Sequence, residues 1–239
     1  MFGLIKDIDI DIEESWRNYI FITIDIDWAP DEIILYTINL LEKYNAKATF
    51  FITHKTYLLK KIIENPNFDI GIHPNFNFLL DGDYRYGKSI SEVIMYFNRI
   101  VPDTLSVRSH ALTQSSIILN KIADMGFKYE LNTYIPFHSG SMLCPYRHCG
   151  KDLIRVPHFW EDDAELLYKS NIKLCSLLNY EGIKVFDFHP IHIFLNTEDM
   201  NRYEKAKKFF KRPKSLFHFQ NKEKYGTGNF LEELCNFYI

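Results

Sequence analysis

Short apolar segments alternate with amphipathic stretches along most of the chain. The segment 19–27 (YIFITIDID) is rich in β-branched residues and predicts a buried strand. Pro30 and Asp31 then begin a predicted helix, in which apolar residues recur at helical spacing. A strand followed by a helix in this way is the repeating unit of α/β proteins.

The same alternation continues toward the C-terminus. Further strands are predicted over 48–54, 69–74, 105–110, 128–135, 153–160 and 183–189, and further helices over 56–64, 90–100, 116–125, 199–211 and 229–238. The segment 139–152 departs from this rhythm, and the pattern does not define its shape. About seven strands that alternate with helices favour one α/β domain with parallel strands, either barrel-like or open.

Composition and charge narrow the class of protein. The 239 residues are 46% hydrophobic and 25% charged, which excludes a disordered chain. A net charge of −3 gives nucleic-acid binding no electrostatic support. No apolar run approaches the roughly 20 residues that span a bilayer, and Lys6 and Asp7 fall where the apolar region of a signal peptide would lie. We therefore expect a soluble, cytoplasmic protein whose four cysteines are free thiols.

Ionisable residues stand at the ends of four predicted strands. They are Asp25 and Asp27, His73, Arg108 and His110, and His189. The C-terminal ends of parallel strands form the rim that carries the active site in such folds. This coincidence predicts a functional site that all four strand ends share.

The sequence Asp25-Ile26-Asp27 places two carboxylates two residues apart. Alternate side chains of a strand share a face, with Cα atoms about 6.6 Å apart. This spacing suits one carboxylate on a metal ion and the other one water away, as a base. The alternative is that the two residues cap the following helix.

A histidine followed by a proline closes two of the apolar runs, at His73 and at His189. A single buried histidine is usually a core or rim residue, but two of the same construction beside an aspartate pair favour a site. His110 lies two residues beyond Arg108, on the same face of its predicted strand. Asp27, His73 and His110 would form a two-histidine, one-carboxylate set, which suits zinc or a related divalent ion.

The order of these motifs resembles that of the NodB-homology polysaccharide deacetylases, carbohydrate esterase family four. The matching segments are 23–27 (TIDID), 47–51 (KATFF), 73–77 (HPNFN), 107–110 (VRSH), 159–163 (FWEDD) and 186–189 (FDFH). The combination of D-x-D-W-A-P, I-H-P-N-F, R-S-H and F-H-P-I-H especially resembles the WbmS-like subgroup from bacterial surface-polysaccharide clusters.

This resemblance covers residues 19–195 and implies a fold. That fold is a single irregular (β/α) barrel of about seven parallel strands. The whole chain, 1–239, would then form one domain, with a helical extension over 196–239.

The resemblance also implies roles for the strand-end residues. Asp25 would be the general base and Asp27 a metal ligand, although the sequence leaves open which of the two has which role. His73 would be the second ligand and His189 the general acid. Asp187, two residues before His189, could hold the imidazolium or instead form a salt bridge at the rim.

Three further residues receive roles in the same way. Arg108 would orient a carboxylate, with Asp162 or Asp163 as its partner. Trp160 would line the pocket and Asp162 would contact the substrate.

One position departs from the family pattern. Asn77 stands where the second metal histidine of the H-[ST]-x-x-H motif is expected. An amide oxygen binds zinc poorly, whereas imidazole is a preferred ligand. We therefore predict that His110 is the third ligand; the alternative is that the site has lost its metal and its activity.

These expectations combine into one function. The chain would be a metal-dependent deacetylase that hydrolyses the amide of an N-acylated sugar, nucleotide-linked or lipid-linked, in bacterial surface-polysaccharide biosynthesis. The metal would be zinc, with cobalt, manganese or nickel as alternatives. Two other readings are a metal-dependent glycosyltransferase that uses the Asp25-Ile26-Asp27 pair and a non-catalytic sugar-binding barrel. The sugar, the acyl group and the oligomeric state are not specified.

Overall fold

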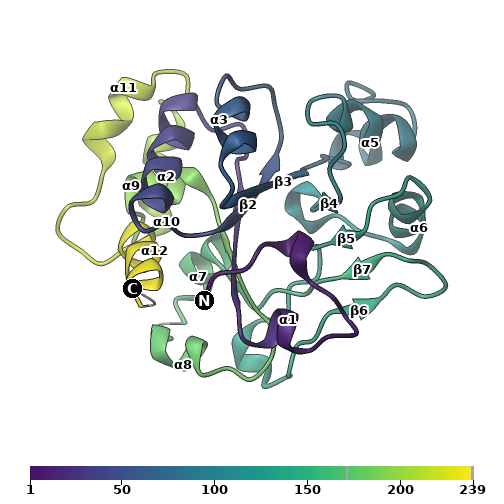
Figure 1. Ribbon diagram of the computed structural model, residues 1–239. Helices are drawn as coiled ribbons and strands as arrows, with labels where there is room; N and C mark the ends of the chain where they lie inside the picture. The colour runs from purple at the N-terminus through teal and green to yellow at the C-terminus, as the bar shows by residue number, and fades with distance from the viewer. Residues whose placement is uncertain (171, 238–239) are drawn as a thin grey trace.

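The computed structural model describes residues 1–170 and 172–237. Its strands form one sheet in the order β6-β7-β5-β4-β3-β2-β1-β9-β8 (Figure 1). They are β1 Ile20–Asp25, β2 Ala48–Ile52, β3 Phe68–Ile72, β4 Ser106–Val107, β5 Tyr129–Glu130, β6 Tyr146–Arg147, β7 Ile154–Arg155, β8 Trp160–Glu161 and β9 Lys184–Phe188. Neighbouring strands are parallel except β6 and β7, so most of the strands end at one edge of the sheet.

Helices of varied length surround the sheet. They are α1 Glu14–Arg17, α2 Asp31–Lys43, α3 Leu59–Glu64, α4 Asn77–Leu80, α5 Ile90–Asn98, α6 Ser116–Asp124, α7 Asp162–Tyr168, α8 Leu174–Leu178, α9 Pro190–Leu195, α10 Met200–Lys207, α11 Pro213–Leu216 and α12 Thr227–Asn236. The curled, mostly parallel sheet with its helices forms a half-barrel of the (β/α) type, which confirms the predicted fold class.

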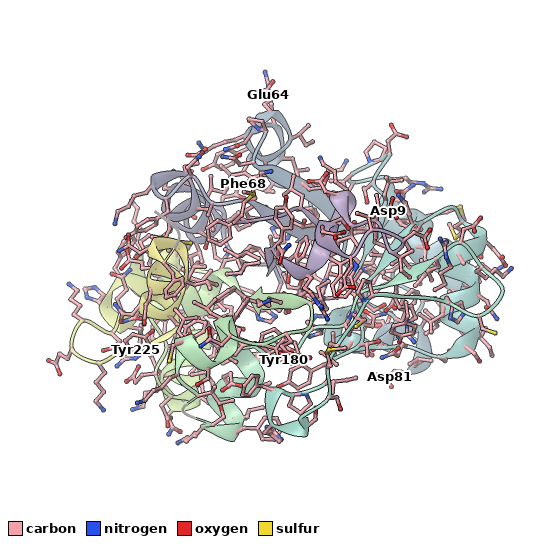
Figure 2. All side chains as sticks on the ribbon, turned by 60° about the horizontal axis from the view of Figure 1, so that its bottom comes forward. Asp9, Glu64, Phe68, Asp81, Tyr180 and Tyr225 are labelled. Carbon is pink, nitrogen blue, oxygen red and sulfur yellow. The ribbon has the colours of Figure 1, made fainter. Side chains whose placement is uncertain are left out.

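The core lies around the central strands β1, β2 and β9. Every residue of β1 and β2 is buried, as is most of β9. Strands of a parallel sheet are covered on both faces, which is why they read as continuous apolar runs. Figure 2 shows side chains filling the space between the ribbons.

The sheet differs from the prediction in its outer strands. It has nine described strands instead of about seven. The predicted strand 153–160 is divided into β7 and β8, and the irregular segment 139–152 contributes the antiparallel β6. The predicted strands 105–110 and 128–135 shorten to two residues each. After β4 the chain turns at His110, where Ala111 and Leu112 have left-handed backbones.

The C-terminal extension packs against α9. α12 contacts α9, and the Asn196 side chain ties the extension together by donating to the carbonyl oxygens of Asn221 and Lys224 at 3.1 and 3.2 Å and to Asn229 Oδ1 at 2.7 Å. α12 ends at Asn236, so the predicted end of this helix at 238 lies outside the described residues. No helix in the described parts of the chain is long and apolar enough to cross a membrane.

Candidate active site

A sharp turn follows β1 and positions Asp27. The strand ends at Asp25, and both Asp27 and Trp28 have left-handed backbones, with φ of 36° and 54°. The Trp28 backbone N–H donates to Thr53 Oγ1 at 3.0 Å, which anchors the turn to the end of β2. Asp27 therefore lies beyond the strand. The direction of its carboxylate is set by the turn and not, as we expected, by the alternation of side chains along a strand. Left-handed backbone costs about 1–2 kcal/mol per non-glycine residue, so the surrounding contacts must hold it.

Asp27 contacts two histidines from other strand ends. Its Oδ1 lies 3.2 Å from His73 Nε2 and 3.2 Å from His110 Nδ1. The ligand atoms of the three residues lie within 4.8 Å of one another. Burial opposes ionisation of Asp27, but hydrogen bonds from His110 and His73 outweigh it and lower the carboxyl pKa well below its usual value. The structure thus brings together the three residues that the sequence predicted as metal ligands.

His110 reaches Asp27 from a turn and not from a strand. β4 ends at Val107, and His110 begins a 3-10 turn in which Ala111 and Leu112 have φ of 54° and 52°. The His110 ring packs edge-on against Trp28, with 5.1 Å between ring centroids. This second left-handed turn therefore faces the first across the site.

Asn77 takes no part in this cluster. It begins α4, and its Oδ1 accepts a hydrogen bond from Thr113 Oγ1 at 2.6 Å. The amide oxygen is already engaged by a neighbouring loop. Of the two candidates for the third ligand position, the geometry favours His110.

A buried ionic network lies beneath the cluster. Arg108 is fully buried, and its Nη1 donates to Asp25 Oδ1 at 3.0 Å, to Thr23 Oγ1 at 3.0 Å and to Asp187 Oδ1. The Thr23 hydroxyl in turn donates to Asp187 at 2.7 Å. Burial raises the pKa of Asp187 well above its usual value, and Arg108 only partly offsets this.

This network corrects two expectations about pairing. The carboxylate partners of Arg108 are Asp25 and Asp187, not Asp162 or Asp163. Asp187 holds Arg108 deep in the sheet, so it neither holds His189 nor forms a salt bridge at the rim. The reason is the sheet register: Asp187 of β9 pairs with Thr23 of β1, which places its carboxylate beside the buried guanidinium.

His189 is held by Asp162. The His189 Nδ1 lies 2.7 Å from Asp162 Oδ1, and the His189 backbone N–H donates to Asp162 Oδ2 at 2.8 Å. The opposite ring nitrogen, Nε2, faces Asp27 Oδ2 at 3.6 Å. Burial opposes the charge on the imidazolium, but the nearby Asp162 and Asp163 carboxylates raise the pKa of His189 well above its usual value. Asp162 is only 1% exposed and supports His189 from behind, away from the position that we expected.

A cavity of about 170 Å³ opens onto this cluster. Its lining includes Asp27, His110 and His189, together with five further side chains: Trp28, Asp163, His192, Tyr203 and Phe210. The position of Trp28, directly after Asp27, could have indicated its place in the site. Tyr203 and Phe210 belong to the C-terminal extension, and no pattern in the sequence connected that segment with the strand ends.

Trp160 lies elsewhere. It stacks on Phe230 of α12 with 4.4 Å between ring centroids, is only 5% exposed, and lines a separate cavity. The β8 strand directs this side chain toward the helical extension, so the expected pocket position is taken by Trp28 instead.

Comparisons with known proteins agree with the fold and the motifs. A family model described as WbmS-like polysaccharide deacetylase matches residues 22–207. A crystal structure from Bordetella bronchiseptica, of a protein assigned as a polysaccharide deacetylase involved in O-antigen biosynthesis, is 41% identical with a TM-score of 0.93; the match covers 100% of this chain and 98% of that chain. A structure from Mycobacterium smegmatis, also assigned as a polysaccharide deacetylase, is 14% identical with a TM-score of 0.48, and the match covers 90% of each chain. No curated protein matches.

The family model spans most of the chain, including the residues that converge on Asp27. The Bordetella structure matches over nearly the full length of both chains. The chain belongs to the WbmS-like family of polysaccharide deacetylases.

Proposed function

We propose that the protein is a metal-dependent deacetylase that hydrolyses the amide of an N-acylated sugar in bacterial surface-polysaccharide biosynthesis. The observation that carries this proposal is the convergence of His73, His110 and His189 on the Asp27 carboxylate. The role of the Bordetella relative in O-antigen biosynthesis supports a surface polysaccharide as the product.

The donor set fits a divalent metal ion. Asp27 supplies a carboxylate oxygen and His73 and His110 supply imidazole nitrogens, which are ligands that zinc prefers. The other ring nitrogen of His73, Nδ1, lies 3.6 Å from Asp25 Oδ2, which is too far for a hydrogen bond but places a carboxylate directly behind the ligand histidine. When bound, a divalent ion would polarise the acyl carbonyl and make water more acidic. Zinc is our first choice, with cobalt, manganese and nickel as alternatives.

Asp25 would be the general base. Its Oδ1 accepts from Arg108 and its Oδ2 faces His73, so the carboxylate is fixed beside the ligand cluster. It would take a proton from the attacking water as the water oxygen bonds to the acyl carbon. Arg108 does not face the cavity, so its role is to position Asp25 and keep that carboxylate in place.

His189 would be the general acid. Because Asp162 engages Nδ1, the opposite nitrogen is the one that can deliver a proton to the site. As the carbon–nitrogen bond breaks, His189 Nε2 would protonate the departing amine. The products are the amino sugar and the carboxylate of the acyl group.

Three finer expectations remain predictions. They are the nucleotide-linked or lipid-linked form of the substrate, the cytoplasmic location, and the action of residues 1–239 as one domain. Pairing of β1 with β9 and packing of α12 on α9 support the last of these. The glycosyltransferase alternative does not fit membership of a deacetylase family.

Metal analysis of matched variants tests the proposal. The purified native protein should hold about one divalent ion per chain and release acetate from nucleotide-linked N-acetylhexosamines. His110→Ala should lose most of the ion, whereas Asn77→Ala should keep it. A native protein without metal, or the opposite behaviour of the two variants, would contradict the proposed ligand set and favour the non-catalytic alternative.

A further inference from the structure

Two neighbouring aspartates at the start of α7 face different partners. Both oxygens of Asp162 are engaged by His189. Asp163 turns to His192 instead, whose Nε2 lies 2.6 Å from Asp163 Oδ1. His192 is almost fully buried, and its other ring nitrogen lies 3.1 Å from Thr197 Oγ1. The Asp163 carboxylate is therefore held at one oxygen by a buried and fixed partner.

The other oxygen of Asp163 is available to a ligand. The side chain is 41% exposed and lines the same cavity as Asp27 and His189. Within the described part of the chain, no hydrogen bond engages its Oδ2. Burial opposes ionisation, but the charge of His189 and the hydrogen bond from His192 lower the pKa of Asp163 to about 2. The cavity wall thus carries a rigid, negatively charged hydrogen-bond acceptor.

The spacing between Asp163 and the general acid suits a sugar ring. An oxygen of Asp163 and a ring nitrogen of His189 lie within 4.8 Å of each other. A ligand with an amide nitrogen and a hydroxyl on neighbouring carbons, as in a sugar ring, has the spacing to contact both. His189 would meet the acylamino nitrogen and Asp163 the hydroxyl next to it.

The rest of the cavity suits a single ring. Trp28, Tyr203 and Phe210 all line the cavity, so aromatic surfaces accompany a small number of polar groups. The cavity has a volume of about 170 Å³. A small cavity of this kind suits one sugar unit.

We propose that Asp163 Oδ2 accepts a hydrogen bond from the ring hydroxyl adjacent to the acylamino group, which makes Asp163 a specificity-determining residue. This inference rests on the proposed function, because it takes the N-acylated sugar as the ligand. His192 and Thr197 position the carboxylate. The acceptor selects sugars that carry a hydroxyl at that carbon.

The test compares Asp163→Asn with a matched surface variant on paired glycosides. The probes are methyl glycosides of 2-acetamido and 4-acetamido hexoses, each with a counterpart that lacks the hydroxyl at carbon 3, the neighbour of both positions. Binding is followed by ligand-observed NMR titration, and turnover by acetate release. The control is Asp124→Asn, whose carboxylate has a similar exposure of 47% but pairs with Lys151 on the surface.

We expect Asp163→Asn to weaken binding and kcat/KM about 10- to 100-fold for the glycoside with the hydroxyl, since a hydrogen bond to a charged group is lost. The counterpart without the hydroxyl should change less than about twofold, and Asp124→Asn should match the native protein on both. Equal losses on both probes would assign Asp163 a structural role and overturn the inference, as would no loss on either.

Measuring binding separately from acetate release distinguishes a failure of this inference from a failure of the proposed function. If the native protein binds the glycosides but releases no acetate, the proposed deacetylation fails while the binding ratio still decides the role of Asp163. If it binds none of them, both fail. Thermal unfolding of Asp163→Asn at the native temperature would show that the variant is folded.

Discussion

At the scale of single residues, the site depends on one buried guanidinium. Arg108 is the shared partner of Asp25 and Asp187. We expect Arg108→Gln to lower the free energy of unfolding by about 3–5 kcal/mol, because two buried carboxyl groups would lose their positive partner. Urea unfolding at neutral pH measures this loss. The deficit should shrink as the pH falls, since protonated carboxyl groups need no such partner.

An exposed ion pair provides the control for this prediction. Arg147 lies 2.9 Å from Asp11 on the surface. Arg147→Gln should change the free energy of unfolding by less than about 1 kcal/mol. Similar losses in the two variants would mean that the burial of Arg108 adds nothing to its contribution.

Asp162 should matter through His189 and not through the substrate. We expect Asp162→Asn to lower kcat by about 10²- to 10⁴-fold, the usual contribution of general acid–base catalysis, with a much smaller change in KM. An asparagine cannot balance the charge of the imidazolium, and its single oxygen cannot replace the two carboxylate oxygens that accept separately from the backbone N–H and the ring Nδ1 of His189. Steady-state kinetics of acetate release measure the changes in kcat and KM separately. A rise in KM with kcat unchanged would return Asp162 to the substrate-contacting role that the motif first suggested.

The proposed metal ligands and the proposed general acid could be predicted from the sequence, but their partners and the aromatic residues of the cavity could not. Asp27, His73, His110 and His189 each stand at the end of a predicted strand, and strand ends meet at one rim in a parallel sheet. Which carboxylate meets Arg108 depends instead on the register between β1 and β9. No local pattern states that register, so the pairing of Asp187 with Arg108 required the structure.

At the scale of elements, two left-handed turns lie beside the proposed metal ligands. Asp27 and Trp28 form one, and Ala111 and Leu112 form the other, directly after His110. Left-handed conformation disfavours residues with a Cβ, whereas glycine adopts it freely. These turns therefore hold conformational strain on both sides of the cluster.

This strain can be measured at Ala111, which is exposed. We expect Ala111→Gly to leave the free energy of unfolding unchanged or to raise it by up to about 1 kcal/mol, because relief of strain offsets the added freedom of the unfolded chain. Ala123→Gly, in α6, should lower it by about 0.5–1 kcal/mol. Urea unfolding of the two variants measures these changes. Equal losses in the free energy of unfolding for both variants would show that the turn at Ala111 is unstrained.

The accuracy of the predicted elements follows from burial. The strands 19–27, 48–54, 69–74 and 183–189 correspond to β1, β2, β3 and β9, whose residues are wholly or mostly buried. The outer strands β4, β5, β7 and β8 have two residues each, which is too short to show an alternation of apolar and polar residues. Their existence depends on pairing with neighbours, so the division of 153–160 into β7 and β8 could not be predicted.

At the scale of the whole molecule, the proposed ligands connect three separate strand ends. Asp27 follows β1, His73 follows β3 and His110 follows β4. An ion that binds only the folded chain stabilises it by about 2.7 kcal/mol at 100 times its dissociation constant. Excess zinc should therefore raise the melting temperature of the metal-free protein by roughly 5–10 °C. His110→Ala should show little of this rise in calorimetry, and an equal rise in both proteins would place the ion elsewhere.

The strand order also sets when the site can assemble. β1, β2, β3 and β4 are neighbours in the sheet and follow one another in the chain. The other neighbour of β1 is β9, residues 184–188, which lies far from β1 in the sequence. His189 and Asp187 arrive with that late strand. Contacts between distant parts of a chain form more slowly than local ones. We therefore expect the groups that would hold the ion to come together during folding before His189, the group that would donate the proton, joins them.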